Sequence, residues 1–561
     1  MKMKAAESLM KILEDQGVEV IFGYPGGAVL PLYDAILKND NIEHVLVRNE
    51  QAAPHAASGY ARMKNRTGVC LATSGPGATN LVTGLATAYM DSVPIVAITG
   101  QVSTPMIGTD AFQEVDITGI TMPITKHNYL VKDANELPRI IAEAFHVAST
   151  GRPGPVLVDI PRDVADTMIE HPDEIVVNIK GYKPTYKGHN SQIKKIVKAL
   201  GKASKPLILA GGGMQYAGAG KELLQFAECI DAPVVTTLNA ISVFPETNER
   251  ALGMLGMHGR PAANYAVSHC DLLISLGARF GDRATGSVAK FAKQAKIIHI
   301  DIDPAEIGKN VRADVPIVGD VKIILKDLND AMTQQEHAPW SKQVAEWKQT
   351  HPMQDQYGNE ADLKPQKIIE KLGELTRDRA VVTTDVGQHQ MWTALHYGFV
   401  KERSFITSGG LGTMGYGLPA AIGVQMADPK QLVICITGDG SFQMNLPEMA
   451  TAIEHCLPIK ILLMNNSSLS LVKQLQHFQC GKRYSGIDFT ANPDFCMLAQ
   501  AYGAKTFRIE TEEEMEDKLK QALASPGLTL IECIVSNEEM VFPFVPGKKG
   551  LDEMVSFNEV D

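Results

Sequence analysis

The chain has 561 residues, of which 45% are hydrophobic and 21% charged, and it carries a formal net charge of -11 at pH 7. This length exceeds what one hydrophobic core supports and predicts about three domains, while the composition excludes disordered, fibrous and membrane-spanning chains. The acidic balance gives no electrostatic reason to bind nucleic acid or an anionic membrane, and the eight scattered cysteines lack CxxC pairs, so we expect a cytoplasmic protein.

Short apolar strands alternate with longer helical patterns along the chain. This alternation predicts an α/β fold of three consecutive domains, each built on a mostly parallel sheet flanked by helices. Expected strands of the first block are 18–22, 68–73, 95–99 and 156–159. The pattern restarts at 206–210, 234–236, 272–276 and 297–302, and again at 380–383, 432–437, 459–464 and 528–534.

Two polar interruptions separate these blocks, at 181–190 and 333–362, and we interpret them as linkers. The expected organisation is therefore three domains and a C-terminal tail of irregular structure, with boundaries at 1–180, 191–332, 363–536 and 537–561. Because one fold hosts many activities, this organisation does not by itself predict a function.

The most informative segment is Gly438-Asp439-Gly440-Ser441, which follows an expected strand; the next strand runs into Asn465-Asn466. Ligands bind at the carboxyl ends of parallel strands, and glycines beside a helix N-terminus let a phosphate approach the backbone. Oxygens of Asp439, Asn466 and a backbone carbonyl near Ser468 would complete an octahedral Mg²⁺ site with diphosphate and water. A lone Gly-Asp-Gly also fits a tight turn, but the combined pattern resembles the thiamine diphosphate signature.

A second candidate element is Glu50, which follows an expected strand at 45–47 and begins a helix. Thiamine chemistry needs a carboxylic acid hydrogen-bonded to N1′ of the pyrimidine, so that the 4′-imino tautomer can remove the weakly acidic C2 proton. Alone, Glu50 would more simply be an acid that complements a helix dipole. With the diphosphate motif present, and with glycine turns at 22–28 and 73–80, the cofactor role is favoured. The cofactor would then bridge the first and third domains.

Other segments decide which thiamine enzyme this is. The chain is similar over essentially its whole length to the large, catalytic subunit of acetohydroxyacid (acetolactate) synthase. The stretches that carry this resemblance are GYPGGA (23–28), IGTDAFQE (107–114), ITKHNYL (124–130), GRPGPVLVDIP (151–161), LGMLGMHG (252–259), GARFGDR (277–283), IDIDPAEIGKN (300–310), DVGQHQMW (385–392), GLGTMGYGLP (410–419) and GDGSFQMN (438–445).

The resemblance implies a carboligase that condenses two pyruvates, or pyruvate with 2-oxobutyrate, with loss of CO₂. The products would be 2-acetolactate or 2-aceto-2-hydroxybutyrate, made in the first common step of branched-chain amino acid biosynthesis. It implies thiamine diphosphate, Mg²⁺ and FAD as cofactors. In this superfamily two subunits build each cofactor site, so a homodimer or homotetramer is implied; whether a regulatory small subunit binds stays open.

The resemblance also implies residue roles. Met414 would wedge beneath the thiazolium ring, Gln113 and Gly26 would face the reacting centre, and Phe112 and Lys126 would lie near where the substrate enters. Without the resemblance, Met414 would be a core methionine and Lys126 a surface cation. The residues expected around the diphosphate and thiazolium are Val386, Gly387, Gln388, His389, Gly438, Gly440 and Ser441.

The middle block matches the family's flavin contacts, although it lacks a GxGxxG fingerprint, so the residues alone would indicate only a weak dinucleotide site. Arg152 of the first domain would reach over to it. Because the condensation has no net redox change, a retained FAD would have a structural role. The expected contacts are Gly212, Thr237, Leu238, Gly256, Met257, His258, Gly277, Arg279, Arg283, Asp301, Ile302, Asp320 and Val321.

Three positions depart from the family pattern. Asn49 stands where His is usual, Ser103 where Pro is common, and Leu475 where Trp is usual. These differences leave the cofactor chemistry intact. In the family that Trp helps to favour 2-oxobutyrate as second substrate, and the positions of Ser103 and Leu475 contact herbicides, so substrate preference and inhibitor binding are expected to differ.

Four alternatives remain. A pyruvate oxidase would pass electrons to the flavin, and the contexts of Lys126 and of 252–259 disfavour it. A simple 2-oxo acid decarboxylase typically uses an adjacent His pair, and the chain has no His-His dipeptide. An FAD-free catabolic acetolactate synthase is the closest alternative, disfavoured by 252–259 and 277–283. A catalytically inactive regulatory scaffold need not retain Glu50, Asp439 and Asn466.

Overall fold

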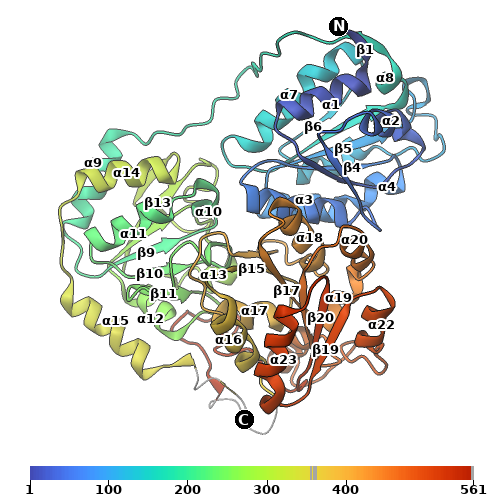
Figure 1. The fold of residues 1–561 in the computed structure, drawn as a ribbon. Coiled ribbons are helices and arrows are strands. Elements are labelled where there is room, and N and C mark those ends of the chain that lie inside the picture. Colours follow the sequence, from blue (N-terminus) through green and yellow to red (C-terminus); the bar gives the residue numbers. More distant parts are fainter. Residues whose placement is uncertain (354–356, 358–362, 558–561) are drawn as a thin grey trace.

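The computed structural model describes residues 1–353, 357 and 363–557. Three six-stranded sheets follow one another along the chain, and helices flank each sheet (Figure 1). In Figure 1 the first domain (blue) lies above the third (orange and red), and the middle domain (green and yellow) lies beside both. The predicted fold class, consecutive α/β domains on parallel sheets, is confirmed.

The first sheet has the strand order β3-β2-β4-β5-β7-β6 with every pair parallel. Its strands are β2 (Val20–Gly23), β3 (Glu43–Leu46), β4 (Gly68–Ala72), β5 (Ile95–Gln101), β6 (His127–Leu130) and β7 (Pro155–Pro161). A separate antiparallel ribbon pairs β1 (Lys2–Lys4) with β8 (Met168–Glu170). The helices are α1 (Ala5–Asp15), α2 (Leu30–Leu37), α3 (Ala52–Lys64), α4 (Pro76–Asn80), α5 (Val82–Met90), α6 (Ile117–Thr121), α7 (Leu137–Ser149) and α8 (Arg162–Asp166).

The middle sheet has the order β11-β10-β9-β12-β13-β14, again entirely parallel. Its strands are β9 (Pro206–Ala210), β10 (Val234–Thr236), β11 (Ala251–Met254), β12 (Leu272–Leu276), β13 (Lys296–Asp301) and β14 (Val315–Val318). The helices are α9 (Asn190–Leu200), α10 (Gly213–Ala217), α11 (Gly220–Cys229), α12 (Pro261–His269), α13 (Asp282–Thr285), α14 (Val321–Ala331) and α15 (Ala338–Thr350).

The third sheet has the order β16-β15-β17-β18-β20-β19, also parallel. Its strands are β15 (Ala380–Thr384), β16 (Phe405–Thr407), β17 (Leu432–Gly438), β18 (Lys460–Asn465), β19 (Lys505–Ile509) and β20 (Thr529–Ile534). The helices are α16 (Pro365–Thr376), α17 (Gln388–His396), α18 (Gly417–Ala427), α19 (Asp439–Asn445), α20 (Glu448–Glu454), α21 (Ser470–Gln479), α22 (Phe495–Ala501) and α23 (Glu512–Ala524). Short 3₁₀ helices are η1 (Gly27–Val29), η2 (Thr104–Met106), η3 (Met122–Ile124), η4 (Ala134–Glu136) and η5 (Leu238–Ala240).

Helix α3 of the first domain packs directly on α18 of the third, and one hydrophobic core continues across the contact (Figure 1). Two glycines allow this close approach. A Cβ on Gly59 would lie 2.1 Å from the Ala420 carbonyl oxygen, and one on Gly423 would lie 1.9 Å from that of Ala56. Neither contact is sterically tolerable, so each position needs glycine. The first and third domains are therefore joined by a fitted interface within one chain.

The first predicted linker, 181–190, belongs to an extended connection between the first and middle domains (Figure 1). It is anchored at both ends. The Tyr182 hydroxyl donates to the Thr150 carbonyl at 2.9 Å, and the Tyr186 carbonyl accepts from the Asp320 amide at 2.8 Å. Part of the second predicted linker, 333–362, lies outside the described residues. Within it, α15 is an ordered helix that joins the middle-domain core through Trp340 and Val344.

The C-terminal tail returns from the third domain to the middle domain. Lys364 and Glu539 form a buried ion pair in the third domain. Further on, the Val545 amide donates to the Met257 carbonyl at 2.8 Å, and the Phe544 ring lies 5.4 Å from the ring of His258. The described part of the tail therefore contacts both the third and the middle domain. Its only β-pairing is an isolated antiparallel bridge between Phe544 and Val555.

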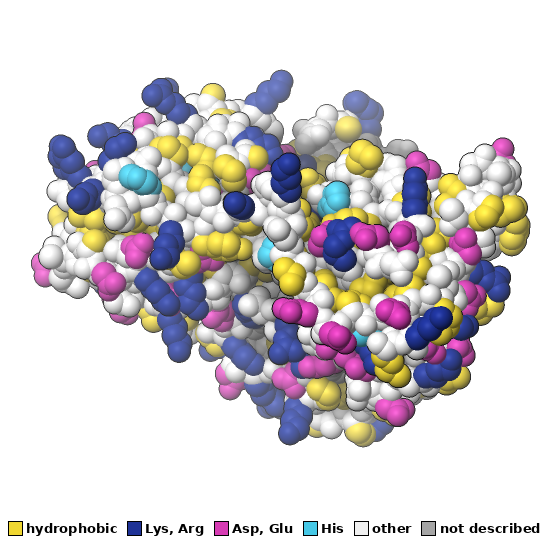
Figure 2. Space-filling model, turned by 90° about the horizontal axis from the view of Figure 1, so that it is seen from above, with side chains coloured by type: hydrophobic (Ala, Val, Ile, Leu, Met, Phe, Trp, Pro, Cys, Tyr) yellow, Lys and Arg dark blue, Asp and Glu magenta, His cyan; other side chains and the backbone are white. Residues whose placement is uncertain are grey.

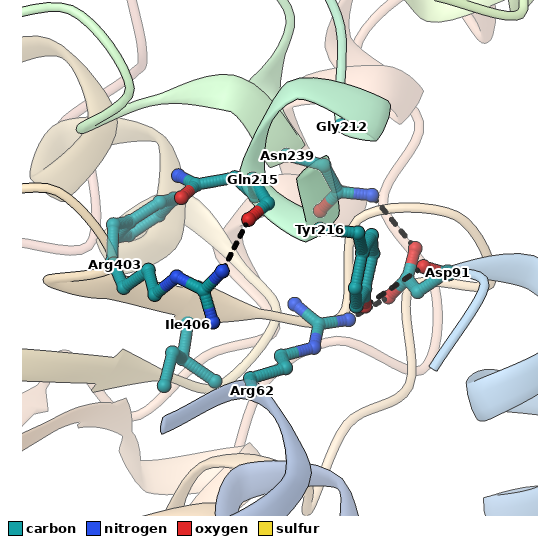
Figure 3. Close-up of a pocket in the computed structure, with 9 residues that line it drawn as sticks. Arg62, Asp91, Gly212, Gln215, Tyr216, Asn239, Arg403 and Ile406 are labelled. Carbon is teal, nitrogen blue, oxygen red and sulfur yellow. Dashed lines mark hydrogen bonds and ion pairs between the residues drawn. The ribbon is translucent and has the colours of Figure 1, made fainter. Parts of the chain in front are cut away.

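All three domains meet around Asp91, which lies directly after α5 (Figure 3). Its carboxylate accepts from Arg62 at 2.9 Å, from the Asn239 amide of the middle domain at 2.8 Å, and from the backbone amides of Gly409 and Gly410 at 3.1 and 2.7 Å. Beside it lies a cavity of about 30 Å³, which is large enough to hold water. The Asp91 side chain is completely buried, so this junction is a fixed part of the fold.

On the face shown in Figure 2, basic and acidic side chains are interspersed with hydrophobic ones. Such mixing matches the moderate net charge of -11. Among the described residues, none of the helices is both long and apolar enough to cross a bilayer.

Candidate active site

Three strand ends of the third sheet gather the predicted diphosphate and metal residues. Strands β15, β17 and β18 are neighbours, and Gly438 at the end of β17 pairs in register with Met464 of β18. Asp439 follows β17 and begins α19, while Asn466 follows β18. The segment after β15 carries Val386 to His389. Residues from 385 to 468 are thus brought to one edge of a parallel sheet, where ligands bind.

The three predicted metal ligands lie on two adjacent turns. Asp439 is buried, and its Oδ2 accepts a hydrogen bond from Asn492 at 2.7 Å. The Asn466 Oδ1 accepts from the Ser468 amide at 3.2 Å, which closes the turn. Burial raises the pKa of the Asp439 carboxyl, because its negative charge is desolvated. A divalent cation at this turn would offset that cost.

The residues predicted to bind the diphosphate pack closely together around one neutral histidine, His389. A Cβ on Gly438 would lie 2.9 Å from His389 Nδ1, and the Ser441 hydroxyl donates to the Val386 carbonyl at 2.9 Å. Burial lowers the pKa of His389 to about 3, so its imidazole is neutral at physiological pH. Its Nε2 is buried and has no hydrogen-bond partner among the described residues, so it is free to meet a bound group. Gln388 instead donates to the Glu539 carbonyl of the tail at 2.9 Å.

The residue that sequence reasoning missed is Asn492, which contacts the predicted metal ligand directly. It lies between α21 and α22, about 50 positions from Asp439, in a segment without strand or helix. Its neighbours Ala491 and Pro493 give no helical or strand period, and Asn is common in such loops. No signal in the single sequence could have found it.

The first-domain half of the predicted site lies at the carboxyl edge of the first sheet. Glu50 sits in the turn between β3 and α3, half-buried, and its Oε2 accepts from the Asn80 amide at 2.9 Å. A Cβ on Gly77 would lie 3.2 Å from Glu50 Oε1, so the Gly77 backbone faces the carboxylate. Gly26 follows β2, and a Cβ there would lie 2.5 Å from the Thr73 side chain. These turns come from three neighbouring strands, β3, β2 and β4.

Gln113 joins this half from the loop after β5. Gly75 has φ +58°, and a Cβ on it would lie 2.8 Å from the Gln113 carbonyl oxygen, so only glycine fits. Gln113 itself has φ 58°, an uncommon conformation for a residue with a side chain. The structure therefore brings Glu50, Gly26 and Gln113 to one edge of the first sheet, as the roles predicted from sequence require.

The remaining predicted catalytic residues lie in different settings. Phe112 is 88% exposed, while Met414 is half-buried in a glycine-rich loop of the third domain. Lys126 donates to the Thr150 carbonyl at 2.8 Å and to the Val147 carbonyl at the end of α7. Burial lowers the pKa of Lys126 to about 8. In this chain the Lys126 ammonium group is thus hydrogen-bonded to the C-terminal end of α7, and the Phe112 side chain is exposed on its loop.

Asp159 is a buried carboxyl behind this loop. It accepts from Thr99 at 2.7 Å and from the Gln101 amide at 3.0 Å, and the same amide donates to the Val115 carbonyl, two residues after Gln113. Burial raises the pKa of Asp159 from 3.8 to about 7. The folded state therefore binds this proton more tightly than the unfolded state does.

We expect Asp159→Asn to change the pH dependence of stability. Because the pKa is raised on folding, the contribution of Asp159 is fully present below pH 3.8 and is lost as pH rises through about 7. The difference in stability, parent minus variant, should therefore fall between pH 4 and pH 8. Urea unfolding midpoints of both proteins across this range measure it. A difference that is constant with pH would show that Asp159 does not titrate there.

In the middle domain the predicted flavin residues follow the carboxyl ends of all six strands. Gly212 follows β9, Thr237 and Leu238 follow β10, and Gly256 to His258 follow β11. Gly277 and Arg279 follow β12, Asp301 and Ile302 lie at the end of β13, and Asp320 and Val321 follow β14. Arg283 lies on α13. One edge of one sheet thus collects every residue of this set.

Two arginines and several carboxyl groups lie at this edge. Arg152 reaches from the first domain and donates to Glu306 at 2.6 Å and Asp303 at 3.3 Å. Burial, followed by the nearby Arg152 charge, lowers the pKa of Arg279, so this pair of cations would gain from an anion. Burial raises the pKa of Asp301 to about 6. Asp320, in contrast, is occupied as the N-cap of α14, where it accepts from Lys322 and Ile323 amides.

Comparison with protein families matches all three domains to one enzyme type. Residues 3–120 match the N-terminal TPP binding domain of thiamine pyrophosphate enzymes, 193–328 match the central domain, and 385–533 match the C-terminal TPP binding domain. The N-terminal match includes Glu50, and the C-terminal match includes Asp439, Asn466 and Asn492.

Curated relatives are similar over nearly the whole chain. A probable acetolactate synthase large subunit of Methanocaldococcus jannaschii is 50% identical, covering 97% of this chain and 94% of that protein. An acetolactate synthase of Mycobacterium bovis is 48% identical (99% and 91%), and an acetolactate synthase large subunit of Haemophilus influenzae is 45% identical (99% and 98%).

Proposed function

The chain belongs to the acetolactate synthase large-subunit family of thiamine pyrophosphate enzymes, and on this premise we propose that it condenses two pyruvates, or pyruvate with 2-oxobutyrate, with loss of CO₂. The products are 2-acetolactate or 2-aceto-2-hydroxybutyrate. The observation that carries this proposal is the pair of half-sites: Asp439 and Asn466 at adjacent strand ends of the third sheet, and Glu50 at the edge of the first.

Mg²⁺ and the diphosphate would be held by the third-domain half-site. The Asp439 carboxylate, the Asn466 amide oxygen and the Ser468 backbone carbonyl are oxygen donors of the kind that Mg²⁺ prefers. The buried, desolvated Asp439 charge and the unpartnered His389 Nε2 support a bound group at this edge. Gly438, Gly440 and Ser441 at the start of α19 offer backbone to phosphate oxygens.

Bound thiamine diphosphate would supply the nucleophilic carbon that attacks the carbonyl of a 2-oxo acid. Glu50 would hydrogen-bond N1′ of the pyrimidine, and its Oε1 faces the Gly77 backbone rather than a basic side chain. Gly26 and Gln113 line the same edge, where they would face the reacting centre. Met414, in a loop of the third domain, would lie beneath the thiazolium ring, and Phe112 and Lys126 would lie near where the substrate enters.

A homodimer or homotetramer would complete the site, because in this enzyme superfamily the first-domain half of each cofactor site comes from one subunit and the third-domain half from another. Phe112 of the first domain and Leu411 and Met444 of the third are exposed apolar side chains near the two half-sites in sequence. A second copy would cover them. A regulatory small subunit is a further candidate partner, and we place the protein in the cytoplasm.

FAD would bind at the carboxyl edge of the middle sheet. The Arg152–Arg279 pair would meet its diphosphate, and Asp301 would accept from ribose hydroxyls. Because the condensation transfers no net electrons, the flavin would stabilise the fold of the middle domain and would not transfer electrons.

Replacing FAD with a redox-incompetent analogue should therefore leave acetolactate formation from pyruvate intact. Removing the flavin altogether should abolish activity, because the middle domain loses a ligand that stabilises its fold. Acetolactate formation and oxygen uptake are measured in parallel with each flavin. If activity follows flavin redox competence and oxygen is consumed, the chain is a pyruvate oxidase instead.

Leu475 should set a weak preference for 2-oxobutyrate. It lies half-buried on α21, and Leu offers a smaller apolar face than the Trp usual in the family. One methylene in a hydrophobic pocket gives about 10–200-fold discrimination at most, so Leu475→Trp should raise 2-oxobutyrate preference within that range. With Ser103→Pro added, sulfonylurea-type inhibitors should also bind more tightly. Competition of both 2-oxo acids measures this; unchanged product ratios and inhibition would exclude Leu475 from the substrate channel.

A further inference from the structure

The loop at 487–492 crosses the metal turn and brings one amide side chain to it. Leu469 donates its backbone amide to the Ile487 carbonyl at 2.8 Å, and Phe489 donates to the Ser467 carbonyl at 2.9 Å. These bonds form an isolated antiparallel bridge between Ser468 and Asp488. The loop is thereby fixed against the Asn466–Ser468 turn, and Asn492 at its end reaches Asp439.

Asn492 connects the two separate parts of the metal site. Its Nδ2 donates to Asp439 Oδ2 at 2.7 Å, and lies 3.4 Å from both Asn465 Oδ1 and Ser467 Oγ. Its Oδ1 faces the other way and accepts from the Gln443 amide at 3.4 Å. The amide orientation is therefore set on both sides, and its oxygen does not face the metal turn. Asn492 is not placed as a ligand.

We propose that Asn492 is a positioning residue for Mg²⁺, which holds the Asp439 carboxylate so that a single oxygen faces the cation. A carboxylate has two oxygens, and Asn492 occupies Oδ2, which leaves Oδ1 to bind. Mg²⁺ demands nearly ideal octahedral geometry and binds few carboxylate oxygens, so one-oxygen ligation suits it. Hydrogen-bonded partners of ligating carboxylates commonly act this way.

Asn492 also stabilises the turn that presents the other ligands. Ser467 has φ 53°, an uncommon conformation for serine, and its hydroxyl lies 3.4 Å from the Asn492 amide. Asn465, the other neighbour of Asn492, is held from behind by donating to Glu532 at 2.8 Å. One side chain thus ties the turn after β17 to the turn after β18. This inference rests on the proposed metal site.

Asn492→Leu, which keeps the size of the side chain and removes the donor, should raise the Kd for Mg²⁺ by about 10–100-fold, the usual cost of losing such a partner. Asn492→Ala should do the same and serves where Leu disturbs folding. Equilibrium dialysis of Mg²⁺ with the full-length chain and saturating thiamine diphosphate measures Kd, with circular dichroism to check folding. The metal concentration that gives half-maximal activity should rise in parallel.

Gln443→Ala is the matched control. It removes only the weak contact to the Asn492 oxygen and one bond to the Asp439 carbonyl at 3.1 Å, so its Kd for Mg²⁺ should change by less than about threefold. A Kd within twofold of the parent in both folded Asn492 variants would overturn the positioning role. If the parent chain itself binds no Mg²⁺ with thiamine diphosphate present, the proposed metal site fails instead.

Discussion

Glu50→Gln should slow deprotonation at C2 of bound thiamine diphosphate by about 10²–10⁴-fold, the usual worth of a positioned acid or base. The amide keeps the size of the side chain and can still accept from Asn80, but it cannot hold and release the carboxyl proton. Cofactor affinity should fall much less, because the diphosphate and Mg²⁺ contacts lie in the third domain. Hydrogen–deuterium exchange at C2, followed by NMR after rapid quenching, measures the effect.

Glu43→Gln is the matched control for this experiment. Glu43 begins the same strand, β3, at its opposite end, and its side chain is 53% exposed beside His455. Its substitution should leave C2 exchange unchanged. Exchange at the parent rate in Glu50→Gln, with cofactor bound, would remove Glu50 from the proposed role.

Asp91→Ala should destabilise the fold by about 3–5 kcal/mol, the cost of removing one partner from a buried ion pair. The side chain of Asp91 is fully buried and that of Arg62 is 12% exposed, so the guanidinium would keep its charge without this carboxylate. The amides of Asn239, Gly409 and Gly410 would lose their acceptor as well. Because these groups come from all three domains, the loss should also loosen the domain junction (Figure 3).

Urea unfolding monitored by fluorescence and circular dichroism measures this change. A chain of three domains need not unfold in one step, so the comparison uses the midpoint of the first transition. Asp34→Ala is the control: its pair with Lys38 is more than half exposed on both sides, and its loss should cost at most about 1 kcal/mol. Equal effects of the two substitutions would show that the buried Asp91 carboxylate does not stabilise the domain junction more than an exposed ion pair does.

The position of a strand in its sheet explains whether the sequence predicted it. The four interior strands of each sheet, such as β9 and β17, are apolar runs buried on both faces and were predicted. Edge strands were not, apart from the segment before Glu50. Edge strand β14 contains Pro316, and β19 has half-buried and exposed residues. An edge strand is less covered, so its sequence need not show a continuous apolar run.

In the candidate site, too, residues next to an apolar strand could be predicted from the sequence, whereas residues that act through contacts between distant loops could not. Gly438 to Ser441 and Asn466 were predicted because each follows an apolar strand directly, and strand ends of a parallel sheet converge. Asn492 and Asp91 act through contacts made by loops from other parts of the chain. Nothing in the residues beside them marks those contacts, so only the three-dimensional structure could reveal them.

The most direct test of the account is to identify the product that the purified chain makes from ¹³C-labelled pyruvate with thiamine diphosphate, Mg²⁺ and FAD. NMR should show 2-acetolactate as the main product, with one CO₂ released for each two pyruvates consumed, and no product without thiamine diphosphate. Addition of 2-oxobutyrate should yield some 2-aceto-2-hydroxybutyrate. Acetaldehyde as the main product, or acetate formed with uptake of oxygen, would contradict the account, because the chain would then be a decarboxylase or an oxidase.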